Sequence, residues 1–480
     1  MKTYKNMKKY QIYLGILLAI LFTSCEDFLD VNKDPDSPTE GEMVESAYLP
    51  GVVALEAFEG TGFASNWSSF WTLQMSNDGD AGREESFILT PAGSNDMWRS
   101  YFNSLPNAKL MMELAEANGN YKYQGIGQIL TAYQYASLTD YFNEIPCTEA
   151  HQFPTEMTPA FDSQEVVYTK INEWLDEGIA NLGRSDVQLS VPAQDDLLFG
   201  GDIDKWMKFA YALKARYALR LSYAPGKTAA TQADLTLAAL VNAMESNADN
   251  ADFVHYQGEG KQNYWYQYQI NWTQNGYLFP SLQFVEMMNV NADPRRTVYF
   301  DALEDGTYLG LKSNTYYDPE TNPASPVSET YLPKDRAQTF MSYVECKFLE
   351  AEAYVLKQQY VNAETALTAA ITADMSALGI ADADITAFLG KILPLPQTLE
   401  AAQEVVINQK YLAMFIENSE PYHDYRRTGY PVLDIAGNIN NPAYPTAPVR
   451  LPYAYDEIQA NGENVPSVNY INDKVWWDNK

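Results

Sequence analysis

Cysteine and histidine are both scarce in this chain of 480 residues, which contains three of each. The cysteines Cys25, Cys147 and Cys346 are too few for a disulfide framework, and no C-x-x-C pair is present for a metal or redox centre. The three histidines lie far apart in the sequence, and no H-E-x-x-H motif occurs. We therefore expect no disulfide-based fold and no metal site built from histidine and cysteine.

Basic residues are also few, because 32 Lys and Arg stand against 63 Asp and Glu, for a formal net charge of −31. This field repels a phosphate backbone, so we expect no nucleic-acid partner. An anionic lipid surface is equally poorly matched to the chain. Hydrophobic residues nevertheless make up 46% of the sequence, which is typical of a globular protein with a sizeable core.

Long hydrophobic runs are rare, and one of them, residues 12–22, follows four lysines near the N-terminus. It is too short to span a bilayer but has the length of the apolar region of an export signal. The run ends at Phe22-Thr23-Ser24-Cys25, which resembles the lipobox at which bacterial lipoproteins are cleaved and diacylated. We therefore predict a signal peptide over residues 1–24 and lipidation of Cys25. A plain secretory signal with a chance cysteine is the alternative.

The segment 25–40 is acidic and broken by prolines, so we expect a tether between the lipid anchor and a folded body over residues 41–480. Four of its side chains alternate as the ligands of a calcium loop do: Asp30, Asn32, Asp34 and Asp36. However, Pro35 replaces the turn glycine, and Gly41 stands where the bidentate glutamate belongs. A structural calcium ion is therefore unsupported, and we expect no cofactor.

Helical periodicity dominates the body. Apolar residues recur at helical spacing in four segments: 167–179, 205–221, 344–355 and 407–415. Asp162 and Glu165 stand in the register of a capping box and predict the start of the first of these helices. The stretch 351–371 is typical of a helix, a short polar turn and a second, alanine-rich helix. This pairing is similar to a tetratricopeptide repeat.

We therefore expect a mainly α-helical fold, in which tetratricopeptide-like helix pairs form a scaffold with long irregular loops and few short strands. No clean internal repeat is present, so a regular solenoid is not supported. Connections rich in Pro, Gly and Asn cover four ranges: 183–201, 255–280, 312–338 and 430–470. None of them is polar and long enough to divide the body, so we expect one unit.

Tyrosine is abundant, with 35 residues, and the segment 256–280 alternates aromatic rings with Asn and Gln. Rings stack on the apolar faces of sugars, and carboxamides pair with hydroxyl groups. A second aromatic cluster lies within 66–74. The two clusters predict a ligand-binding surface of six residues: Trp265, Tyr266, Tyr268, Trp272, Trp67 and Trp71. The same mixture suits an extended peptide, and aromatic packing in the core is the alternative for both clusters.

Motifs of catalysis are absent. Neither a G-x-S-x-G elbow nor a P-loop occurs, and Gly125 and Gly127 lack the third glycine of a dinucleotide fingerprint. Three acid pairs lie close in sequence: Asp78 and Asp80, Asp195 and Asp196, and Asp202 and Asp204. Because two carboxylates suffice for glycoside hydrolysis, a hydrolase is the alternative from another class. We expect a binding protein and not an enzyme.

Several motifs, met in order along the chain, resemble those of one family. They are Trp98-Arg99-Ser100-Tyr101, Asp140-Tyr141-Phe142-Asn143-Glu144-Ile145-Pro146, Gly201-Asp202 with Lys205-Trp206 and Arg216, Asp293-Pro294-Arg295, Ser342-Tyr343 with Glu350-Ala351-Glu352-Ala353, and His423-Asp424-Tyr425-Arg426-Arg427. Asn143 and Cys147 depart from the glycine and tyrosine of the family pattern. On these motifs the chain is similar to the SusD/RagB-like nutrient-binding lipoproteins of the outer membrane, in the branch called SusD-like group two.

The resemblance implies a lipid-anchored protein on the outward face of the outer membrane. Members of the family bind a glycan or a peptide, cap a SusC-like TonB-dependent transporter and pass the ligand to it without catalysis. We therefore expect an oligosaccharide or polysaccharide ligand, with a peptide as the alternative. The motifs indicate the fold and not the ligand, and we expect Arg426 and Arg427 to pair with carboxylates or to stack on rings.

Overall fold

The computed structural model describes residues 43–78, 86–152, 155–268, 278–439 and 442–480. The helices and strands in these ranges belong to one unit, Glu45–Lys480. The predicted signal peptide, the tether and the calcium-loop residues lie outside the described residues. In the ranges that are described, no helix combines the length and the apolar character needed to cross a membrane.

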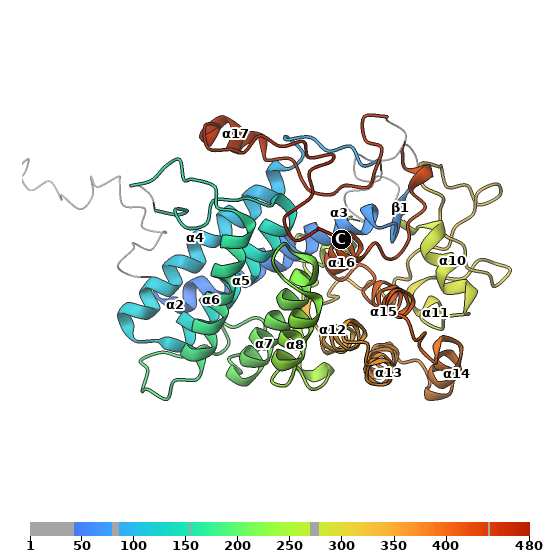
Figure 1. Cartoon of the computed structure of the whole chain (residues 1–480), viewed down its shortest axis with the longest axis horizontal. Coiled ribbons are helices and arrows are strands. Elements are labelled where there is room, and N and C mark those ends of the chain that lie inside the picture. Colours follow the sequence, from blue (N-terminus) through green and yellow to red (C-terminus); the bar gives the residue numbers. More distant parts are fainter. Residues whose placement is uncertain (1–42, 79–85, 153–154, 269–277, 440–441) are drawn as a thin grey trace, which may run out of the picture. The chain divides into compact units, whose positions relative to one another are not determined.

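Helices make up most of the unit, and Figure 1 shows them coloured along the chain. Up to residue 249 they are α2 (Glu45–Leu55), the π-helix η2 (Glu56–Gly62), α3 (Phe63–Trp71), α4 (Asn95–Asn118), α5 (Tyr121–Phe142), α6 (Gln164–Leu182), α7 (Ile203–Arg220), η3 (Leu221–Tyr223), α8 (Ala229–Leu240) and η4 (Asn247–Asp249). After it they are α9 (Tyr264–Gln267), α10 (Leu282–Val290), α11 (Arg296–Tyr299), α12 (Tyr343–Leu356), α13 (Tyr360–Ala377), α14 (Asp382–Ile392), α15 (Leu399–Ala413), α16 (Glu420–Thr428), η6 (Ile435–Gly437) and α17 (Tyr455–Asn461). The mainly helical fold is as predicted.

The strands are short and form two antiparallel pairs. β1 (Met75–Asn77) pairs with β3 (Leu278–Pro280), with Met75 opposite Pro280. β2 (Ala251–Phe253) pairs with β4 (Gln338–Met341), and the register shifts between Ala251 and Asp252. Both pairs join segments that lie far apart in the sequence, so they connect the long loops to the helical scaffold.

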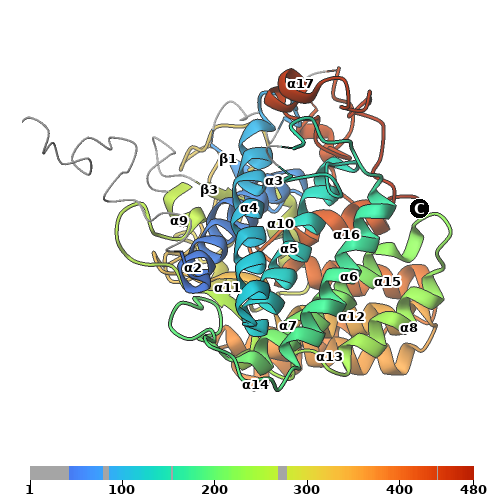
Figure 2. The ribbon, with the colours of Figure 1, turned by 90° about the vertical axis from the view of Figure 1, so that its left-hand side faces the viewer.

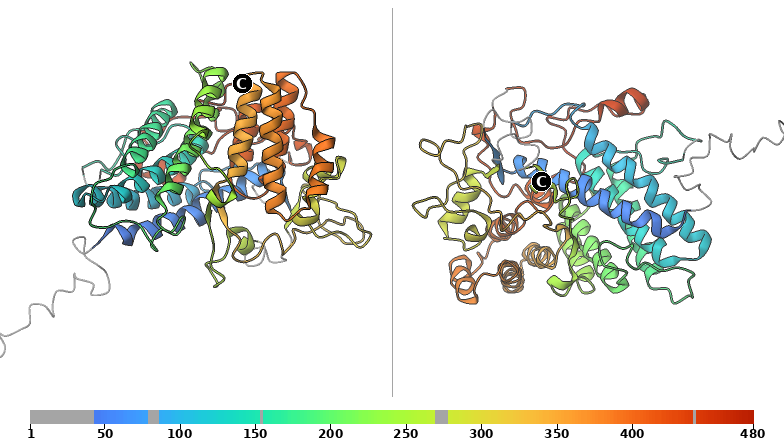
Figure 3. Two further views of the ribbon diagram at one scale, coloured as in Figure 1. Left: turned by 90° about the horizontal axis from the view of Figure 1, so that it is seen from below. Right: turned by 180° about the vertical axis from the view of Figure 1, so that it is seen from behind.

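The predicted tetratricopeptide-like pair is α12 with α13. The chain reverses at Gln358, which has a positive φ of 57°. Small buried side chains of α13, such as Ala363 and Ala370, face the buried Ala351 and Val355 of α12 and allow the two helices to pack closely. The left panel of Figure 3 shows these two helices beside α15 and α14.

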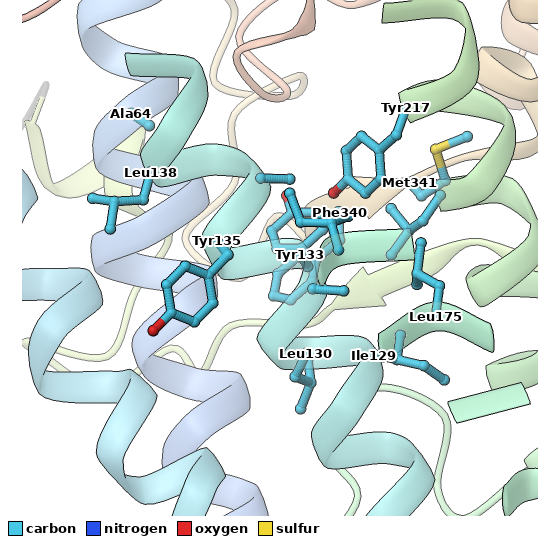
Figure 4. Close-up of a cluster of buried hydrophobic side chains, with 14 of the residues drawn as sticks. Ala64, Ile129, Leu130, Tyr133, Tyr135, Leu138, Leu175, Tyr217, Phe340 and Met341 are labelled. Atoms are coloured by element: carbon cyan, nitrogen blue, oxygen red, sulfur yellow. The ribbon is translucent and has the colours of Figure 1, made fainter. Parts of the chain in front are cut away.

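A second layer is formed by α4, α5 and α6, which lie side by side in Figure 2. Gly125 and Gly178 make the approach of α5 to α6 possible, because a Cβ on Gly125 would lie 2.8 Å from the carbonyl oxygen of Gly178. Gly125 therefore has a packing role. Figure 4 shows the core that results, in which Tyr133 of α5 stacks on Phe340 of β4 at 5.3 Å between ring centroids.

Helix α6 begins one residue later than the predicted capping box requires. Ser163 is the N-cap, and its hydroxyl accepts a hydrogen bond from the amide of Val166. The carboxylate of Asp162 instead accepts hydrogen bonds from the amides of Cys147 and Thr148. The prediction of Asp162 as the cap was wrong, because this carboxylate is used to hold the preceding loop.

Charged side chains from the sequence motifs pair with one another in the interior. Arg216 of α7 donates two hydrogen bonds to Glu345 of α12, at 2.7 and 2.6 Å. Arg427 of α16 donates two to Glu352 of α12, at 2.6 and 2.7 Å. All four side chains are buried. Because buried ions are tolerated only when they are paired, these motif residues hold α7, α12 and α16 in register.

Arg426 and Arg427 divide the two expected roles between them. Arg427 pairs with Glu352 and also with Asp424, at 2.8 Å. Arg426 places its guanidinium carbon 4.1 Å from the ring centroid of Tyr422 and 4.7 Å from that of Trp477. The expectation for this motif is therefore confirmed, and both arginines serve the scaffold.

Candidate ligand-binding site

Three of the six predicted ligand-binding residues are core residues. Trp71 and Trp265 have no exposed surface, and Trp67 is 7% exposed. The indole nitrogen of Trp265 donates a hydrogen bond to the hydroxyl of Ser65 at 2.9 Å. Trp71 packs edge-on against Tyr422, with ring centroids 5.0 Å apart. This corrects the expectation for Trp71 and Trp265, since a ring without exposed surface cannot stack on a ligand in this conformation. The role of Trp67 in binding stays a prediction.

The other three predicted residues are placed differently. Tyr266 and Tyr268 are half-buried, and Tyr268 packs against Phe70 with ring centroids 6.3 Å apart. Their role in binding stays a prediction. Trp272 lies outside the described residues.

The segment 256–268 nevertheless contributes to a surface depression. Its helix α9 is fixed by Asn263, whose side-chain oxygen accepts hydrogen bonds from the amides of Trp265 and Tyr266. The side-chain nitrogen of Asn263 donates to the carbonyl oxygen of Arg336 at 3.1 Å. This double anchorage places the ring of Tyr264 against η2.

The π-helix η2 and the first residue of α3 supply two further rings, those of Phe58 and Phe63. The amide of Phe63 donates a hydrogen bond to the carbonyl oxygen of Phe58, five residues earlier, as a π-turn requires. The ring of Tyr264 lies 5.5 Å from that of Phe58 and 6.0 Å from that of Phe63, measured between centroids. All three rings line the depression. A spacing of five residues matches neither an α-helix nor a strand, so sequence periodicity did not reveal Phe58 and Phe63 as a pair.

The π-turn is wound around a buried carboxyl group. Thr61 donates a hydrogen bond from its hydroxyl to Glu56 at 3.2 Å, and burial raises the pKa of Glu56 to about 8. A Cβ on Gly60 would lie 2.3 Å from a carboxylate oxygen of Glu56, so an alanine there would force the Glu56 side chain to move. At neutral pH we therefore expect Glu56 to be mostly protonated and to contribute structure, not charge, beneath the depression.

The depression has a volume of about 410 Å³ and combines the three rings with polar groups. The polar side chains are Glu59, Asp96, Arg99, Ser100 and Asn103. Arg99 is held in place by Asp456, whose Oδ2 accepts a hydrogen bond from Nε at 2.7 Å. Aromatic faces beside hydroxyl, amide and charged groups are the features that bind a sugar ring: the rings cover its apolar face, and the polar groups take its hydroxyls.

Four of the six carboxylates in the acid pairs considered for a hydrolase accept hydrogen bonds within the structure. Asp195 accepts a hydrogen bond from the hydroxyl of Tyr123 at 2.8 Å, and Asp196 accepts one from the indole nitrogen of Trp206 at 2.7 Å. Asp202 is the N-cap of α7. Asp78 accepts a hydrogen bond from the amide of Tyr317 at 2.6 Å, and Asp80 lies outside the described residues. In the described ranges, no three His, Cys, Asp or Glu side chains are grouped so that they could hold a metal ion.

A family model described as "Starch-binding associating with outer membrane", of the SusD-like type, matches residues 61–454 of the chain. Among curated protein sequences, none matches the chain significantly.

Solved structures with the same fold cover almost the whole chain. A SusD/RagB family protein from Bacteroides thetaiotaomicron has a TM-score of 0.73 at 24% identity, with 91% of this chain and 99% of that one covered. A chitin-binding SusD homologue from Flavobacterium johnsoniae has a TM-score of 0.74 at 20% identity, over 90% and 98% of the two chains. A further structure, described as a chitin-binding protein, has a TM-score of 0.75 at 23% identity, over 90% and 99%.

Proposed function

The chain belongs to the SusD-like family, and we propose that it is a surface lipoprotein of the outer membrane that binds an oligosaccharide or polysaccharide and delivers it to a SusC-like TonB-dependent transporter. The main support for ligand binding is the depression, in which the rings of Phe58, Phe63 and Tyr264 lie beside hydrogen-bonding side chains. Two proteins with the same fold are described as chitin-binding, which supports a glycan as the ligand.

The ligand that we propose is uncharged. The chain has a formal net charge of −31, so a glycan rich in carboxylates or sulfates would be repelled as it approached. Each stacked ring contributes about 1 kcal/mol, whereas micromolar binding needs about 8 kcal/mol in total. Three rings are therefore insufficient by themselves, and the polar side chains of the depression must add hydrogen bonds to the sugar.

Attachment to the membrane rests on Cys25 in this proposal. A single acyl chain gives only marginal anchoring, whereas the diacylglyceryl group proposed here would insert two chains into the bilayer. The lipid anchor would therefore hold the protein at the surface, and contact with the proposed transporter would add to this attachment.

A peptide ligand and a glycoside hydrolase are the two alternatives. The purified chain should be tested on an array of glycans and peptides, and each bound glycan should then be incubated with it and examined for fragments. We expect binding to at least one uncharged glycan, no binding to peptides and no fragments. Binding to peptides alone would contradict the glycan assignment, and fragments that disappear after one Asp or Glu substitution would establish a hydrolase.

A further inference from the structure

A second cleft lies away from the aromatic depression and has a different character. Its volume is about 390 Å³, and it is lined by segments from η4, α11, β4, α12, α13 and the end of α15. None of its lining residues lines the aromatic depression. The side chains that matter below are Glu417, Asp374, Arg336, Thr339, Asn247 and Tyr331.

Two carboxyl groups face this cleft with unused hydrogen-bonding capacity. In the described part of the chain, the carboxylate of Glu417 makes no hydrogen bond and no ion pair. Asp374 is 7% exposed, and its Oδ2 accepts a hydrogen bond from Nη1 of Arg295 at 3.0 Å. Its other oxygen has no partner among the described residues. The side-chain oxygen of Asn247, also at the cleft, is buried and accepts no hydrogen bond from any residue that the structure describes.

Nearby basic groups do not neutralise these acids. Arg295 is shared by Asp293, at 2.6 Å, and Asp374. Arg336 donates one hydrogen bond to the hydroxyl of Tyr331 at 3.0 Å and forms no salt bridge in the described ranges. Asp252 adds a further carboxyl, which accepts a hydrogen bond from Thr339 at 2.7 Å. Two arginines, Arg295 and Arg336, are thus outnumbered by four carboxyl groups: Glu417, Asp374, Asp293 and Asp252.

The pKa values of the carboxyl groups in the cleft are shifted. Burial raises the pKa of Glu417 to about 8 and that of Asp374 to about 6, although Arg336 and Arg295 respectively oppose the shift. Burial also raises the pKa of Asp252. Near neutral pH Glu417 is therefore mostly protonated, and a positive charge placed in the cleft would favour its ionisation.

We propose that this cleft binds the primary ammonium group of a small polar ligand, with Glu417 and Asp374 as its charge partners and Asn247 as a hydrogen-bond acceptor. An amino sugar and a lysine side chain carry the same group, so the cleft chemistry fits both. Its volume accommodates a molecule of either size. The proposal does not depend on glycan binding in the aromatic depression.

Titration calorimetry on the full chain tests the proposal with two pairs of probes. The first pair is glucosamine and N-acetylglucosamine, and the second is Nα-acetyl-lysine amide and its Nε-acetylated form. We expect at least one amine to bind and its acetylated partner to bind at least tenfold more weakly. Comparison of the two amines distinguishes the sugar from the amino acid. Failure of both amines to bind, or equal binding of an acetylated partner, would overturn the proposal.

Proton release provides an independent measurement. Binding an ammonium group should ionise Glu417, so heats measured at pH 7 in buffers of different ionisation enthalpy should reveal a released proton. The affinity for the lysine probe should rise from pH 6 to pH 8, because Glu417 loses its proton over this range. The other ionisable groups near Glu417 are Asp374, Asp252, Asp293, Glu345, Arg295, Arg336, Tyr299 and Tyr331. Binding without proton release would contradict the assignment of Glu417.

Two variants of the cleft and one control variant complete the test. Glu417→Gln should weaken amine binding at least tenfold and abolish proton release, and it should fold, because it replaces a carboxyl that is mostly protonated at pH 7 by a neutral group of the same shape. Glu304→Gln makes the same change at an exposed position outside the cleft and should have no effect. Ala377→Phe, which fills the cleft and leaves its charges, should also abolish binding. Unchanged amine binding in either cleft variant would refute the site.

Discussion

Phe63 donates its backbone amide hydrogen to the carbonyl oxygen of Phe58, and this π-turn bond sets both rings on the wall of the aromatic depression. An ordinary α-helix would place residues five apart on different parts of its surface. The inserted turn therefore aligns two rings that α-helical geometry separates, and it does so where Tyr264 adds a third.

Replacing the rings tests their part in binding. Phe63→Leu and Phe58→Leu keep most of the apolar bulk but remove the aromatic face, so each should weaken glycan affinity by about 1 kcal/mol, or fivefold, in calorimetry. Tyr316→Leu removes a tyrosine that is 64% exposed and does not line the depression, so it serves as the control. Affinities that match the unsubstituted chain in both phenylalanine variants would remove the depression as the binding site.

Gly62 is the second test of the π-turn. A Cβ at this position would lie 2.9 Å from both the Cβ of Tyr264 and the carbonyl oxygen of Ala57. Gly62→Ala should therefore cost about 1–3 kcal/mol in the free energy of unfolding and should displace Tyr264. Gly51→Ala, in the middle of α2, is the matched control, since no described residue lies within 4 Å of its new methyl group. It should stabilise the chain by about 0.5–1 kcal/mol. Denaturant titration of both variants measures these changes in the free energy of unfolding.

The buried ion pairs predict that a substitution far from the aromatic depression strongly lowers the free energy of unfolding. Glu352→Ala leaves the buried Arg427 with Asp424 as its one charged partner among the described residues, and it should cost about 3–5 kcal/mol in the free energy of unfolding. Glu404→Ala replaces a half-buried side chain of α15 that forms no ion pair with any described residue, and it should change the free energy of unfolding by less than about 0.5 kcal/mol. A loss for Glu352→Ala no larger than that of the control would show that the pair does not support the fold.

Stability should fall as the pH rises from 5 to 8. Glu56 has a pKa near 4.5 when unfolded and about 8 when buried. The folded chain therefore binds more protons over this interval, and each step up in pH favours the unfolded state. Glu56 alone accounts for a loss of about 3–4 kcal/mol between these two pH values. In Glu56→Gln this part of the loss should disappear from denaturation midpoints measured at pH 5 and pH 8, whereas an unchanged slope would mean that Glu56 ionises normally.

The lipid anchor is tested by Cys25→Ala. Without the thiol no diacylglyceryl group can be attached, so the variant should appear in the soluble fraction after cell fractionation. Cys147→Ala is the control, because this cysteine is buried and should have no effect on membrane attachment. Retention of Cys25→Ala in the membrane would contradict lipidation at this residue.

Sequence reasoning succeeded where local pattern is enough. The helical spacing in 205–221 predicts α7, and the alanine-rich second half of 351–371 predicts the hairpin of α12 and α13. It failed at Asp162, because this carboxylate accepts hydrogen bonds from the amides of Cys147 and Thr148 in a neighbouring loop and does not cap the helix. It also failed at Trp265, because the aromatic and carboxamide composition of a segment does not indicate which of its faces is covered.

Local sequence by itself determined the helices, the family and the division between scaffold motifs and loops, since periodicity and motif order require only neighbouring residues. Tertiary structure decided which aromatic rings reach solvent and which acids find a partner. The reason is physical, because burial and charge pairing depend on segments that are far apart in the sequence and close in the fold. Examples are Phe58 with Tyr264 and Asp374 with Glu417. A local sequence pattern contains no information about such contacts.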